Sequence, residues 1–366
     1  MKLLFDARYI RTDHHDGISR YSAELLTATA HAVREDPRVR LCALVSDPAQ
    51  RRFFPELPTI TGPSVTSPAE VFTGALLTRY APDVVFSPMQ TMGSLGRRHR
   101  LILTLHDLIY YDHPQPPGDL PLPVQWGWRA YHAAWWPQRL TLNRADAVAT
   151  VSETSREQIL AHHLTKREVR VVANAAPSSG IPEDQALERL ARRGTDLVYM
   201  GSFLPYKNVE TLVRAMAHLP GHTLHLLSRI TPAREAELRS RIPEGAQVIF
   251  HHGVSEDEYR ELLTTCAALV TASRAEGYGL PLVEAFAQGA PVVCSDLPIF
   301  HEVAGDAAGY APADDDAAFA ARVRELTDPG LARERVLAGL HRIREHTWAD
   351  SARELLDLAW ELHRRD

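Results

Sequence analysis

The sequence predicts an α/β protein made of two domains, each built on a doubly wound parallel sheet. The chain has 366 residues, which is enough for two domains of ordinary size. Short apolar runs alternate with helical stretches in both halves, as strands and helices do in such sheets. The segment Ser178–Gly194 contains Gly180, Pro182 and several charged residues, and it separates the two series. It predicts a linker between the domains.

Composition excludes several classes of protein. Hydrophobic residues make up 45% of the chain, too many for a disordered protein. The 40 basic and 46 acidic residues give a net charge of −6, which argues against a nucleic-acid-binding protein with a basic surface. Asp6 interrupts the opening apolar residues too soon for a signal peptide, and no run of about 18 apolar residues follows. We expect a cytoplasmic protein, and peripheral contact with the inner face of a membrane stays open.

The three cysteines are too few for a disulfide framework and too badly spaced for a zinc site. Cys42, Cys266 and Cys294 each lie in or beside an apolar run, where a thiol behaves as a small hydrophobic side chain. This usage indicates a reducing compartment.

In the first half, strands are expected at residues 3–5, 41–45, 81–88, 101–105, 147–151 and 169–174. Gly17 opens a helix that places Ile18, Tyr21 and Leu25 on one face. The loop before it holds no G-x-G-x-x-G, which argues against a dinucleotide fingerprint. His106 and Asp107 follow a strand directly, and the carboxyl end of a parallel strand is where open α/β sheets bind ligands.

A tryptophan-rich helical stretch follows, with Trp126, Trp128, Trp135 and Trp136 among Arg129, Arg139 and Arg144. Indoles favour the border between apolar and aqueous phases, so an acceptor platform or an interfacial patch is one interpretation. The favoured interpretation is an aromatic core with arginines that reach outward to water.

The second series opens with a strand at residues 197–200, and strands are expected at 224–227, 248–250, 267–271 and 292–295. A glycine, Gly201, ends the opening strand, and Lys207 stands just before the next helix. A lysine at this place can contact a diphosphate as a point charge.

The most informative stretch runs from Ser273 to Gly289 and joins a buried strand to a helix. Gly277 and Gly279 allow a tight turn, and Pro281 suits the start of a helix. The N-terminus of that helix offers free N–H groups and a positive dipole end, which suit a diphosphate. Glu276 and Glu284 flank the turn with seven residues between them, and carboxylates accept paired hydrogen bonds from sugar hydroxyls.

At these residues a family resemblance emerges. Residues 276–284, E-G-Y-G-L-P-L-V-E, are very similar to the E-x7-E signature of the retaining, nucleotide-sugar-dependent glycosyltransferases of family 4, which have the GT-B fold. Residues 17–21, G-I-S-R-Y, resemble the G-I-G-R-Y segment of a mannosyltransferase-like branch, with Ser19 in place of its second glycine. Residues 104–107 resemble the family's T-x-H-D, and residues 147–155 resemble its V-x-V-S-E-x-S.

The resemblance implies two Rossmann-like domains that face a cleft. Residues 1–180 would bind the acceptor and residues 190–348 the nucleotide sugar, while a tail helix at 349–366 would cross back to the first domain. Relatives carry an arginine in the loop before Lys207, where this chain has Ser202 and Tyr206. We take Arg229 or Arg274 as its hypothetical replacement.

The site residues implied by the resemblance fall into three groups. His106 and Glu276 are the catalytic candidates. Donor binding is assigned to Gly201, Ser202, Lys207, Arg229, Gly253, Arg274, Gly277, Tyr278, Gly279, Leu280 and Glu284. The acceptor side is assigned Gly17, Ser19, Tyr21 and Asp107.

The implied reaction moves a hexosyl group of the mannose or glucose type from a nucleotide diphosphate sugar to a hydroxyl of a glycan or glycolipid, in cell-surface polysaccharide assembly. GDP-mannose is weakly favoured and UDP-sugars stay open, as do the acceptor and the oligomeric state. The alternatives are a GT-B-like epimerase or phosphorylase and a non-catalytic protein that binds sugar nucleotides. A nicotinamide oxidoreductase is disfavoured by the missing glycine fingerprint.

Neither a metal nor another cofactor is expected. Asp314, Asp315 and Asp316 invite comparison with the metal-binding D-x-D of another glycosyltransferase fold, but they lie in an Ala-rich stretch that favours a solvated helix N-terminus. A metal site at His251 and His252 is disfavoured.

Overall fold

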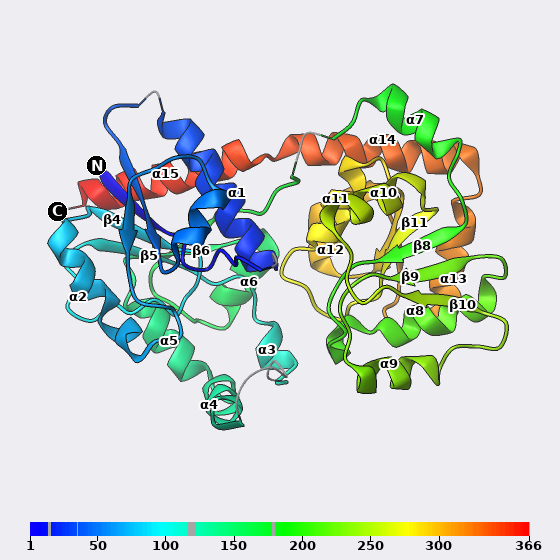
Figure 1. Ribbon diagram of the computed structural model, residues 1–366, viewed down its shortest axis with the longest axis horizontal. Coiled ribbons are helices and arrows are strands. Elements are labelled where there is room, and N and C mark those ends of the chain that lie inside the picture. The colour runs from blue at the N-terminus through cyan, green and yellow to red at the C-terminus, as the bar shows by residue number, and fades with distance from the viewer. Residues whose placement is uncertain (14–15, 35, 116–121, 178–179, 366) are drawn as a thin grey trace. The chain divides into compact units, whose positions relative to one another are not determined.

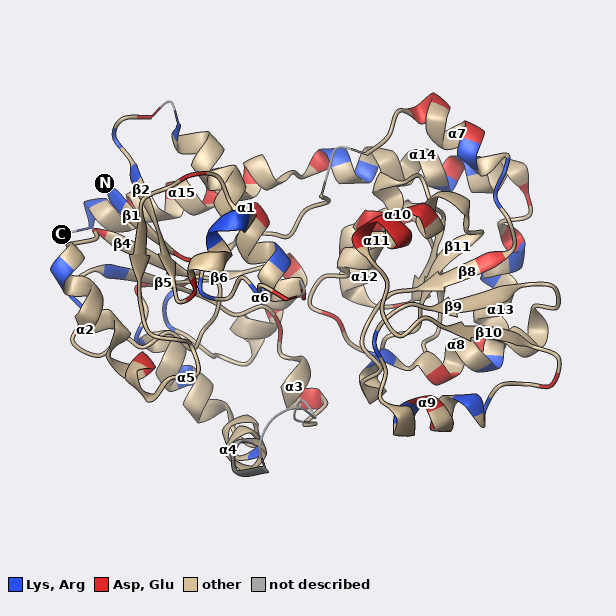
Figure 2. Cartoon of the chain, viewed as in Figure 1, with Lys and Arg blue, Asp and Glu red and all other residues tan. Residues whose placement is uncertain are grey.

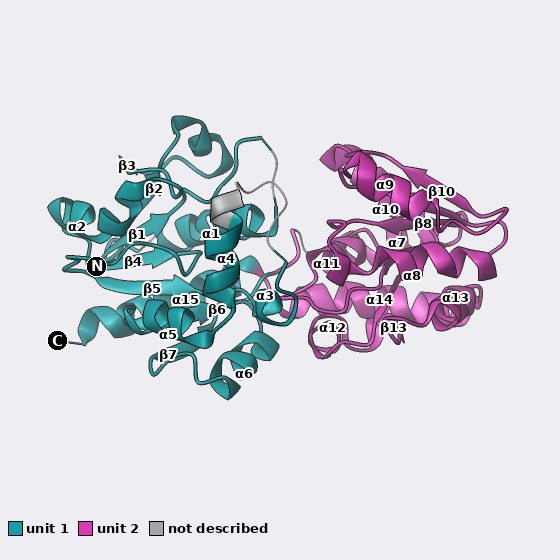
Figure 3. Cartoon of the chain, turned by 90° about the horizontal axis from the view of Figure 1, so that it is seen from below, with its two compact units in different colours: residues 1–174, 348–366 teal, residues 175–347 magenta. Residues whose placement is uncertain are grey.

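The computed structural model describes residues 1–13, 16–34, 36–115, 122–177 and 180–365, and the side chains of residues 122–124 are outside the description. The chain forms two compact units, drawn in two colours in Figure 3. Unit 1 is Met1–Asn174 with Trp348–Asp366, and unit 2 is Ala175–Thr347. In the described residues each unit holds one parallel sheet, so the predicted fold class is confirmed.

Unit 1 contains a seven-stranded sheet in the order β3-β2-β1-β4-β5-β6-β7, counted over the described residues. Its strands are β1 (Lys2–Asp6), β2 (Arg40–Val45), β3 (Thr59–Thr61), β4 (Val84–Ser87), β5 (Arg100–Thr104), β6 (Ala147–Thr150) and β7 (Glu168–Val171). Its α-helices are α1 (Gly17–Val33), α2 (Thr73–Leu77), α3 (Ile109–Asp112), α4 (Leu122–His132), α5 (Trp135–Asn143), α6 (Glu153–Ala161) and α15 (Trp348–Arg364). Short 3₁₀ helices are η1 (Pro48–Phe53), η2 (Pro68–Phe72) and η3 (Thr78–Tyr80).

Unit 2 contains a six-stranded sheet in the order β10-β9-β8-β11-β12-β13, again over the described residues. Its strands are β8 (Asp196–Tyr199), β9 (Thr223–Leu226), β10 (Gln247–Phe250), β11 (Ala268–Thr271), β12 (Val292–Ser295) and β13 (Ala308–Ala311). Its α-helices are α7 (Glu183–Leu190), α8 (Val209–Ala215), α9 (Pro232–Arg239), α10 (Glu256–Thr265), α11 (Leu280–Ala287), α12 (Pro298–Ala304), α13 (Asp316–Glu325) and α14 (Pro329–Glu345). Short 3₁₀ helices are η4 (Pro205–Lys207), η5 (Met216–His218) and η6 (Gly305–Ala307).

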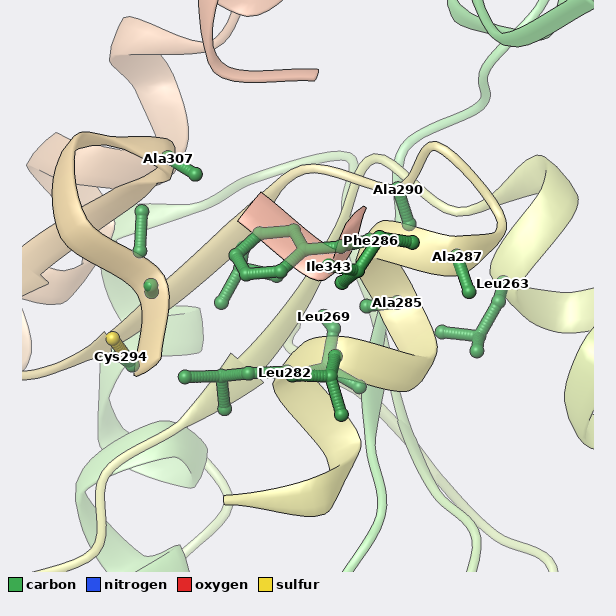
Figure 4. Close-up of a cluster of buried hydrophobic side chains, with 14 of the residues drawn as sticks. Leu263, Leu269, Leu282, Ala285, Phe286, Ala287, Ala290, Cys294, Ala307 and Ile343 are labelled. Atoms are coloured by element: carbon green, nitrogen blue, oxygen red, sulfur yellow. The ribbon is translucent and has the colours of Figure 1, made fainter. Parts of the chain in front are cut away.

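Alternate residues of the unit 2 strands enter separate cores on the two faces of the sheet. Leu197 and Tyr199 of β8 lie in one core, whereas Val198 lies in the other. A strand buried on both faces is therefore apolar at successive positions, as Leu197, Val198 and Tyr199 of β8 show. The core of Figure 4 joins β11 and β12 to α11 and α14, with Phe286 beside Ile343.

Helix α15 belongs to unit 1 although it ends the chain. Figure 1 draws it in red against the blue α1, and the two helices are in contact. Its buried residues Leu355, Leu358, Ala359 and Leu362 follow the i, i+3, i+4, i+7 spacing of one helical face. The apolar face of the tail helix is therefore buried within unit 1.

The segment predicted as a linker is partly a helix of unit 2. Helix α7 occupies residues 183–190 and buries Ala186 completely. Arg193, just after it, donates hydrogen bonds to the backbone carbonyls of Leu263, Cys266 and Gly289. Glycine and charged residues in this segment suggested a linker, but its few apolar side chains suffice to bind one helix to unit 2.

Two of the strands, β3 and β13, were not predicted from the sequence. The three residues of β3 lie in a Pro-rich connection, and β13, with the sequence Ala-Gly-Tyr-Ala, contains no β-branched residue. Both strands lie at sheet edges, where pairing with one neighbouring strand holds them despite a weak local preference.

The favoured interpretation of the tryptophan-rich stretch is wrong for two of its four tryptophans. Trp135 is stacked between Tyr111 and His162, at ring-centroid distances of 3.8 and 4.3 Å. Trp126 and Trp136, in contrast, are exposed to 70% and 66%. Two indoles therefore point to solvent from a folded aromatic cluster.

His99, directly before β5, is buried, and we expect it to make unit 1 sensitive to acid. Neither ring nitrogen has a hydrogen-bond partner in the described residues, and burial, assisted by the charge of Arg97, lowers the pKa of His99 from 6.5 to about 4. Between these two values the unfolded chain binds a proton that the folded chain does not. The free energy of unfolding should therefore fall as the pH drops from 6.5 to 4, by on the order of 3 kcal/mol.

The variant His99→Phe removes this titration and keeps an aromatic ring in the core. Its free energy of unfolding, measured with urea between pH 7 and pH 4, should fall less steeply than that of the wild type. Parallel curves for the two proteins would show that His99 does not supply the acid sensitivity.

Candidate functional site

The strand order of unit 2 reverses between β8 and β11, which are paired with each other. In a parallel α/β sheet, such a reversal leaves a crevice at the carboxyl ends of the two strands. The loop after β8 leads through η4 to α8, and the loop after β11 leads to α11. Both predicted donor loops therefore begin at the position where this fold binds ligands.

An ion pair joins these two loops. Lys207 Nζ lies 2.6 Å from Glu276 Oε1, and their side chains are 17% and 13% exposed. The same carboxylate oxygen accepts a hydrogen bond of 2.7 Å from Ser273 Oγ. Lys207 and Glu276, which are far apart in the sequence, are thus held side by side. Together they can contact a ligand that carries both negative charge and hydroxyl groups.

The turn before α11 has the backbone conformation that its glycines predict. Gly279 has a φ of 103° and forms the N-cap of α11, which carries no side-chain cap. The N–H groups of the first helical turn are therefore not taken by a capping side chain, and they suit an anion. The helix begins at Leu280, so Pro281 stands second rather than first in it.

We expect Gly279→Ala to destabilise unit 2 by about 3 kcal/mol. A Cβ at this position would lie 2.8 Å from Cε1 of the buried Phe300, in addition to the strain of its positive φ. Gly221 provides a matched control, since its φ is 83° and a Cβ there would meet nothing within 4 Å. Gly221→Ala should cost only about 1 kcal/mol. Equal losses in urea unfolding would contradict the role of the Phe300 contact.

Glu284 is almost buried in α11, with 8% of its surface exposed. Its Oε2 accepts a hydrogen bond of 3.0 Å from the hydroxyl of Tyr259 in α10. This bond fixes the direction of the carboxylate.

The two arginines considered as a replacement differ in how they are bound. Arg274 Nε donates to Asp314 Oδ1 at 3.1 Å and its Nη1 donates to the carbonyl of Pro205 at 3.1 Å. The hydrogen bonds from Arg274 lower the pKa of Asp314. Arg229 is exposed, its side chain lies against Gly253, and it has no hydrogen bond or ion pair with the described residues. Arg229 is thus the more available cation.

The other predicted donor residues lie in or near the loops after β8 and β11. Gly201 N donates to Ser228 Oγ at 3.2 Å, which ties the β8 loop to the residue beside Arg229. Gly253 follows β10 with a φ of 110°. Tyr278 packs against the core of Figure 4, and burial raises its pKa. Ser202 and Gly277 lie in the same two loops, with Gly277 buried, and Leu280 is the first residue of α11.

In unit 1, His106 lies two residues beyond β5. Its Nε2 lies 2.8 Å from the carbonyl oxygen of Pro88, and its ring meets the edge of Tyr21 at a centroid distance of 5.0 Å. Burial lowers the pKa of His106 below 6.5, so the ring is neutral at pH 7. Since a carbonyl only accepts, Nε2 carries the proton and Nδ1 keeps its lone pair. The ring can therefore accept a hydrogen bond from a hydroxyl.

The predicted acceptor-side residues mainly hold the loop and helix around His106. Gly17 begins α1, while Ser19 is buried and its Oγ accepts from the backbone N–H of Arg11 at 2.8 Å. Tyr21 is also buried, and its hydroxyl donates to the carbonyl of Val172 at 3.0 Å. Asp107 accepts from the N–H of Ile109 at 3.0 Å. The Ser19 and Tyr21 side chains are thus buried and do not face solvent.

Three residues of this site were missed by the sequence analysis: Ser273, Tyr259 and Asp314. Ser273 stands at a strand end three residues before Glu276, which is a local signal. Tyr259 has no such local signal in the sequence, because its partner Glu284 is 25 residues away. Asp314 was assigned with its neighbours to a solvated helix N-terminus, whereas it pairs with Arg274.

The acidic run after Asp314 forms the predicted helix N-terminus. Asp315 is the N-cap of α13 and accepts from the N–H of Ala318 at 2.9 Å, and Asp316 pairs with Arg214 and His218. Within the described ranges, no three His, Cys, Asp or Glu side chains are grouped to hold a metal ion. Among the helices of those ranges, none is long and apolar enough to cross a membrane.

Comparison with known proteins matches both units. The family described as "Glycosyl transferase 4-like domain" matches residues 16–175, and the family "Glycosyl transferases group 1" matches residues 182–336. The chain is 26% identical over 198 residues to the O-antigen chain mannosyltransferase RfbU of Salmonella typhimurium, which covers 51% of this chain and 53% of that protein. It is 28% identical over 278 residues to O-antigen chain mannosyltransferase B of Escherichia coli, which covers 71% of this chain and 70% of that protein.

The chain thus spans about half the length of the Salmonella relative. Among solved structures, the sucrose-phosphate synthase of Thermosynechococcus elongatus matches all of both chains with a TM-score of 0.75 and 19% identity, which shows the fold. The two family matches, one on each Rossmann-like unit, agree with the signature at residues 276–284. The chain belongs to the family 4 glycosyltransferases, which have the GT-B fold.

Proposed function

We propose that this protein transfers a mannosyl or similar hexosyl group from a nucleotide diphosphate sugar to a hydroxyl of a glycan or glycolipid acceptor. The observation that carries the proposal is the Lys207–Glu276 pair beside the uncapped N-terminus of α11. A lysine and a helix N-terminus without a side-chain cap suit a diphosphate, and a carboxylate suits the hydroxyls of the sugar attached to it.

In this mechanism the bond between the anomeric carbon and the diphosphate oxygen breaks while the acceptor oxygen bonds to that carbon. The proton of the acceptor hydroxyl passes to the departing diphosphate. Lys207 and the N–H groups of residues 277–280 stabilise the charge that develops on the leaving group. Glu276 holds sugar hydroxyls, Glu284 holds the ribose and His106 orients the transferred sugar. The anomeric configuration is retained, and neither a metal nor a cofactor takes part.

The donor would replace an interaction that already exists. In the structure, the positive charge of Lys207 is compensated by Glu276 at 2.6 Å. A nucleotide sugar offers a diphosphate to Lys207 and hydroxyls to Glu276, so both groups exchange one partner for another. A nucleoside diphosphate without the sugar satisfies only the lysine. This difference favours the intact donor over its product.

Two mannosyltransferases of O-antigen chains are among the relatives, and a third relative is a GDP-mannose:cellobiosyl-diphosphopolyprenol alpha-mannosyltransferase, so we favour GDP-mannose as the donor. These two relatives act on O-antigen chains, so an acceptor in cell-surface polysaccharide belongs to this proposal. The experiment that tests the function is a thermal-shift panel of GDP, UDP, TDP and ADP with their sugar conjugates. We expect the largest shift with GDP-mannose, followed by mannose transfer in an acceptor screen. No shift with any nucleotide would overturn the proposal.

We expect Arg229→Ala to weaken binding of the donor nucleotide about tenfold. The reason is that Arg229 is exposed and has no partner in the described residues, so its charge is available to the diphosphate. Arg274→Ala, which removes an arginine already paired with Asp314, should change the affinity less than about threefold. The affinities can be measured by titration calorimetry. If neither substitution weakens binding, no arginine replaces the one absent from the loop.

A further inference from the structure

The surface of α4 and α5 in unit 1 is basic, aromatic and exposed. Residues 122–145 contain no aspartate or glutamate, and they carry Arg129, Arg139 and Arg144. Figure 2 accordingly draws no red on α4 or α5. The chain as a whole has a net charge of −6, so this positive surface stands out from the rest of the molecule.

The exposed apolar side chains of this surface are large. Trp126 and Trp136 are followed by Leu140, which is 50% exposed one helical turn after Trp136. The neighbouring Trp135 is stacked inside the aromatic cluster, so the cluster is formed without Trp136. The guanidinium of Arg129 lies 6.0 Å from the ring centre of Trp126. Each exposed indole thus has a cation on its own helix.

An open hollow of about 680 Å³ lies between α5 and the turn before β7. It is lined by Trp136, Arg139, Leu140, Asn143, Lys166 and Arg167. Arg139 donates to the carbonyls of His162 and His163, and Arg167 donates to the carbonyl of Asn143. These bonds hold both guanidinium groups at helix ends, and among the described residues no carboxylate lines the hollow. Arg139 and Arg167 are therefore held in place, and Lys166 adds a third cation to the lining of the hollow.

We propose that this surface, formed by Trp126, Arg129, Trp136, Arg139, Leu140, Lys166 and Arg167, docks on a membrane that contains anionic phospholipids. Indole rings favour the level of the lipid headgroups, where their apolar body and N–H group are both satisfied. Lysine and arginine next to them attract anionic headgroups. A soluble phosphate would explain the cations but would leave the indoles and Leu140 in water.

The overall charge of the chain makes this docking directional. An anionic membrane repels a protein of net charge −6, except where a basic surface faces it. The contact itself is independent of the proposed function. Its use, which is to bring unit 1 to the layer that contains a glycolipid acceptor, rests on that function.

The test is co-sedimentation of the full chain with vesicles of phosphatidylcholine, or of phosphatidylcholine and phosphatidylglycerol in equal parts. We expect binding to the anionic vesicles at low salt and about tenfold weaker binding to the neutral ones. The double variant Trp136→Ser/Leu140→Ser should bind anionic vesicles at least about tenfold more weakly than the wild type. Lys166→Glu should be weaker by about tenfold at low salt, and the difference should shrink at high salt.

A matched control is Val71→Ser/Phe72→Ser. It removes two exposed apolar side chains from η2 of the same unit, and neither of them lines the hollow. It should bind like the wild type. Equal losses in the control and in the α5 variant would overturn the assignment of this surface, as would equal binding of the wild type to neutral and anionic vesicles. The wild-type comparison needs no variant, so it decides the question even if a double variant fails to fold.

Thermal shifts with the donor nucleotide separate the two proposals. The surface variants should keep the wild-type shift, because they leave unit 2 unchanged. Normal vesicle binding without any nucleotide shift would overturn the proposed function alone, whereas a normal shift without vesicle binding would overturn the docking surface alone.

Discussion

Replacing Glu276 by glutamine is expected to lower the rate of sugar transfer by a factor of about 10²–10³ while the fold is kept. The carboxylate lies at the switch point of the unit 2 sheet, oriented by Lys207 at 2.6 Å and by Ser273 at 2.7 Å. Glutamine has nearly the same shape but loses the charge that strengthens hydrogen bonds from sugar hydroxyls. Because the pair is partly exposed, its loss should cost only about 1 kcal/mol of stability.

The same substitution should affect the binding of the nucleoside diphosphate and of the intact nucleotide sugar differently. Without the carboxylate, Lys207 is no longer compensated, so the affinity for the nucleoside diphosphate should stay the same or rise. The affinity for the intact nucleotide sugar should fall. Titration calorimetry with both ligands, together with a transfer assay, measures these effects.

Asp314→Asn is the matched control for Glu276→Gln. It also neutralises a carboxylate that is paired with a cation of the β11 loop, namely Arg274. Transfer by this variant should stay within about threefold of the wild-type rate. Near-normal transfer by Glu276→Gln would remove Glu276 from the site, and equal losses in the two variants would point to a general effect of charge.

The second large effect is expected for His106→Ala, which should lower kcat about 10²-fold and leave the affinity for the donor nucleotide nearly unchanged. His106 belongs to unit 1, whereas the nucleotide loops belong to unit 2. The bond between Nε2 and the carbonyl of Pro88 leaves Nδ1 as a hydrogen-bond acceptor. Removing the ring therefore removes an acceptor for a hydroxyl without changing any residue of the nucleotide loops.

The pH dependence tests the same assignment. Burial lowers the pKa of His106 below 6.5, so the neutral, accepting form predominates at pH 7 and is lost only on acidification below 6.5. Wild-type kcat should fall in that range, and the residual kcat of His106→Ala should not show this fall. Global unfolding must be excluded by circular dichroism at each pH, because His99 destabilises unit 1 over part of the same range.

His132→Ala is a suitable control for His106→Ala. His132 Nδ1 also lies near a carbonyl oxygen, that of Trp128 at 2.9 Å, and burial lowers the pKa of His132 too. With a soluble acceptor, His132→Ala should transfer sugar at nearly the wild-type rate. Loss of nucleotide affinity in parallel with kcat in His106→Ala would indicate that His106 has a structural role.

The sequence by itself determined the features that depend on neighbouring residues. Strands such as β4 and β8 are apolar at nearly every position because both faces of a parallel sheet are covered. Gly279 marks a turn because only glycine adopts its φ of 103° without strain. Ser152 caps α6 by accepting from the N–H three residues later. The turn that carries Glu276 could therefore be placed between a strand and a helix without a structure.

Only the tertiary structure decided which distant residues meet. Lys207 pairs with Glu276 over 69 residues, Arg274 with Asp314 over 40 and Tyr259 with Glu284 over 25. These contacts depend on the order in which the strands assemble, with β8 next to β11, and hydrophobic periodicity does not record that order. The tertiary structure also decides which side chains are exposed. Trp135 and Trp136 are adjacent in sequence, yet Trp135 is stacked in the aromatic cluster of unit 1 and Trp136 faces water. The reason is that successive residues of a helix point in different directions.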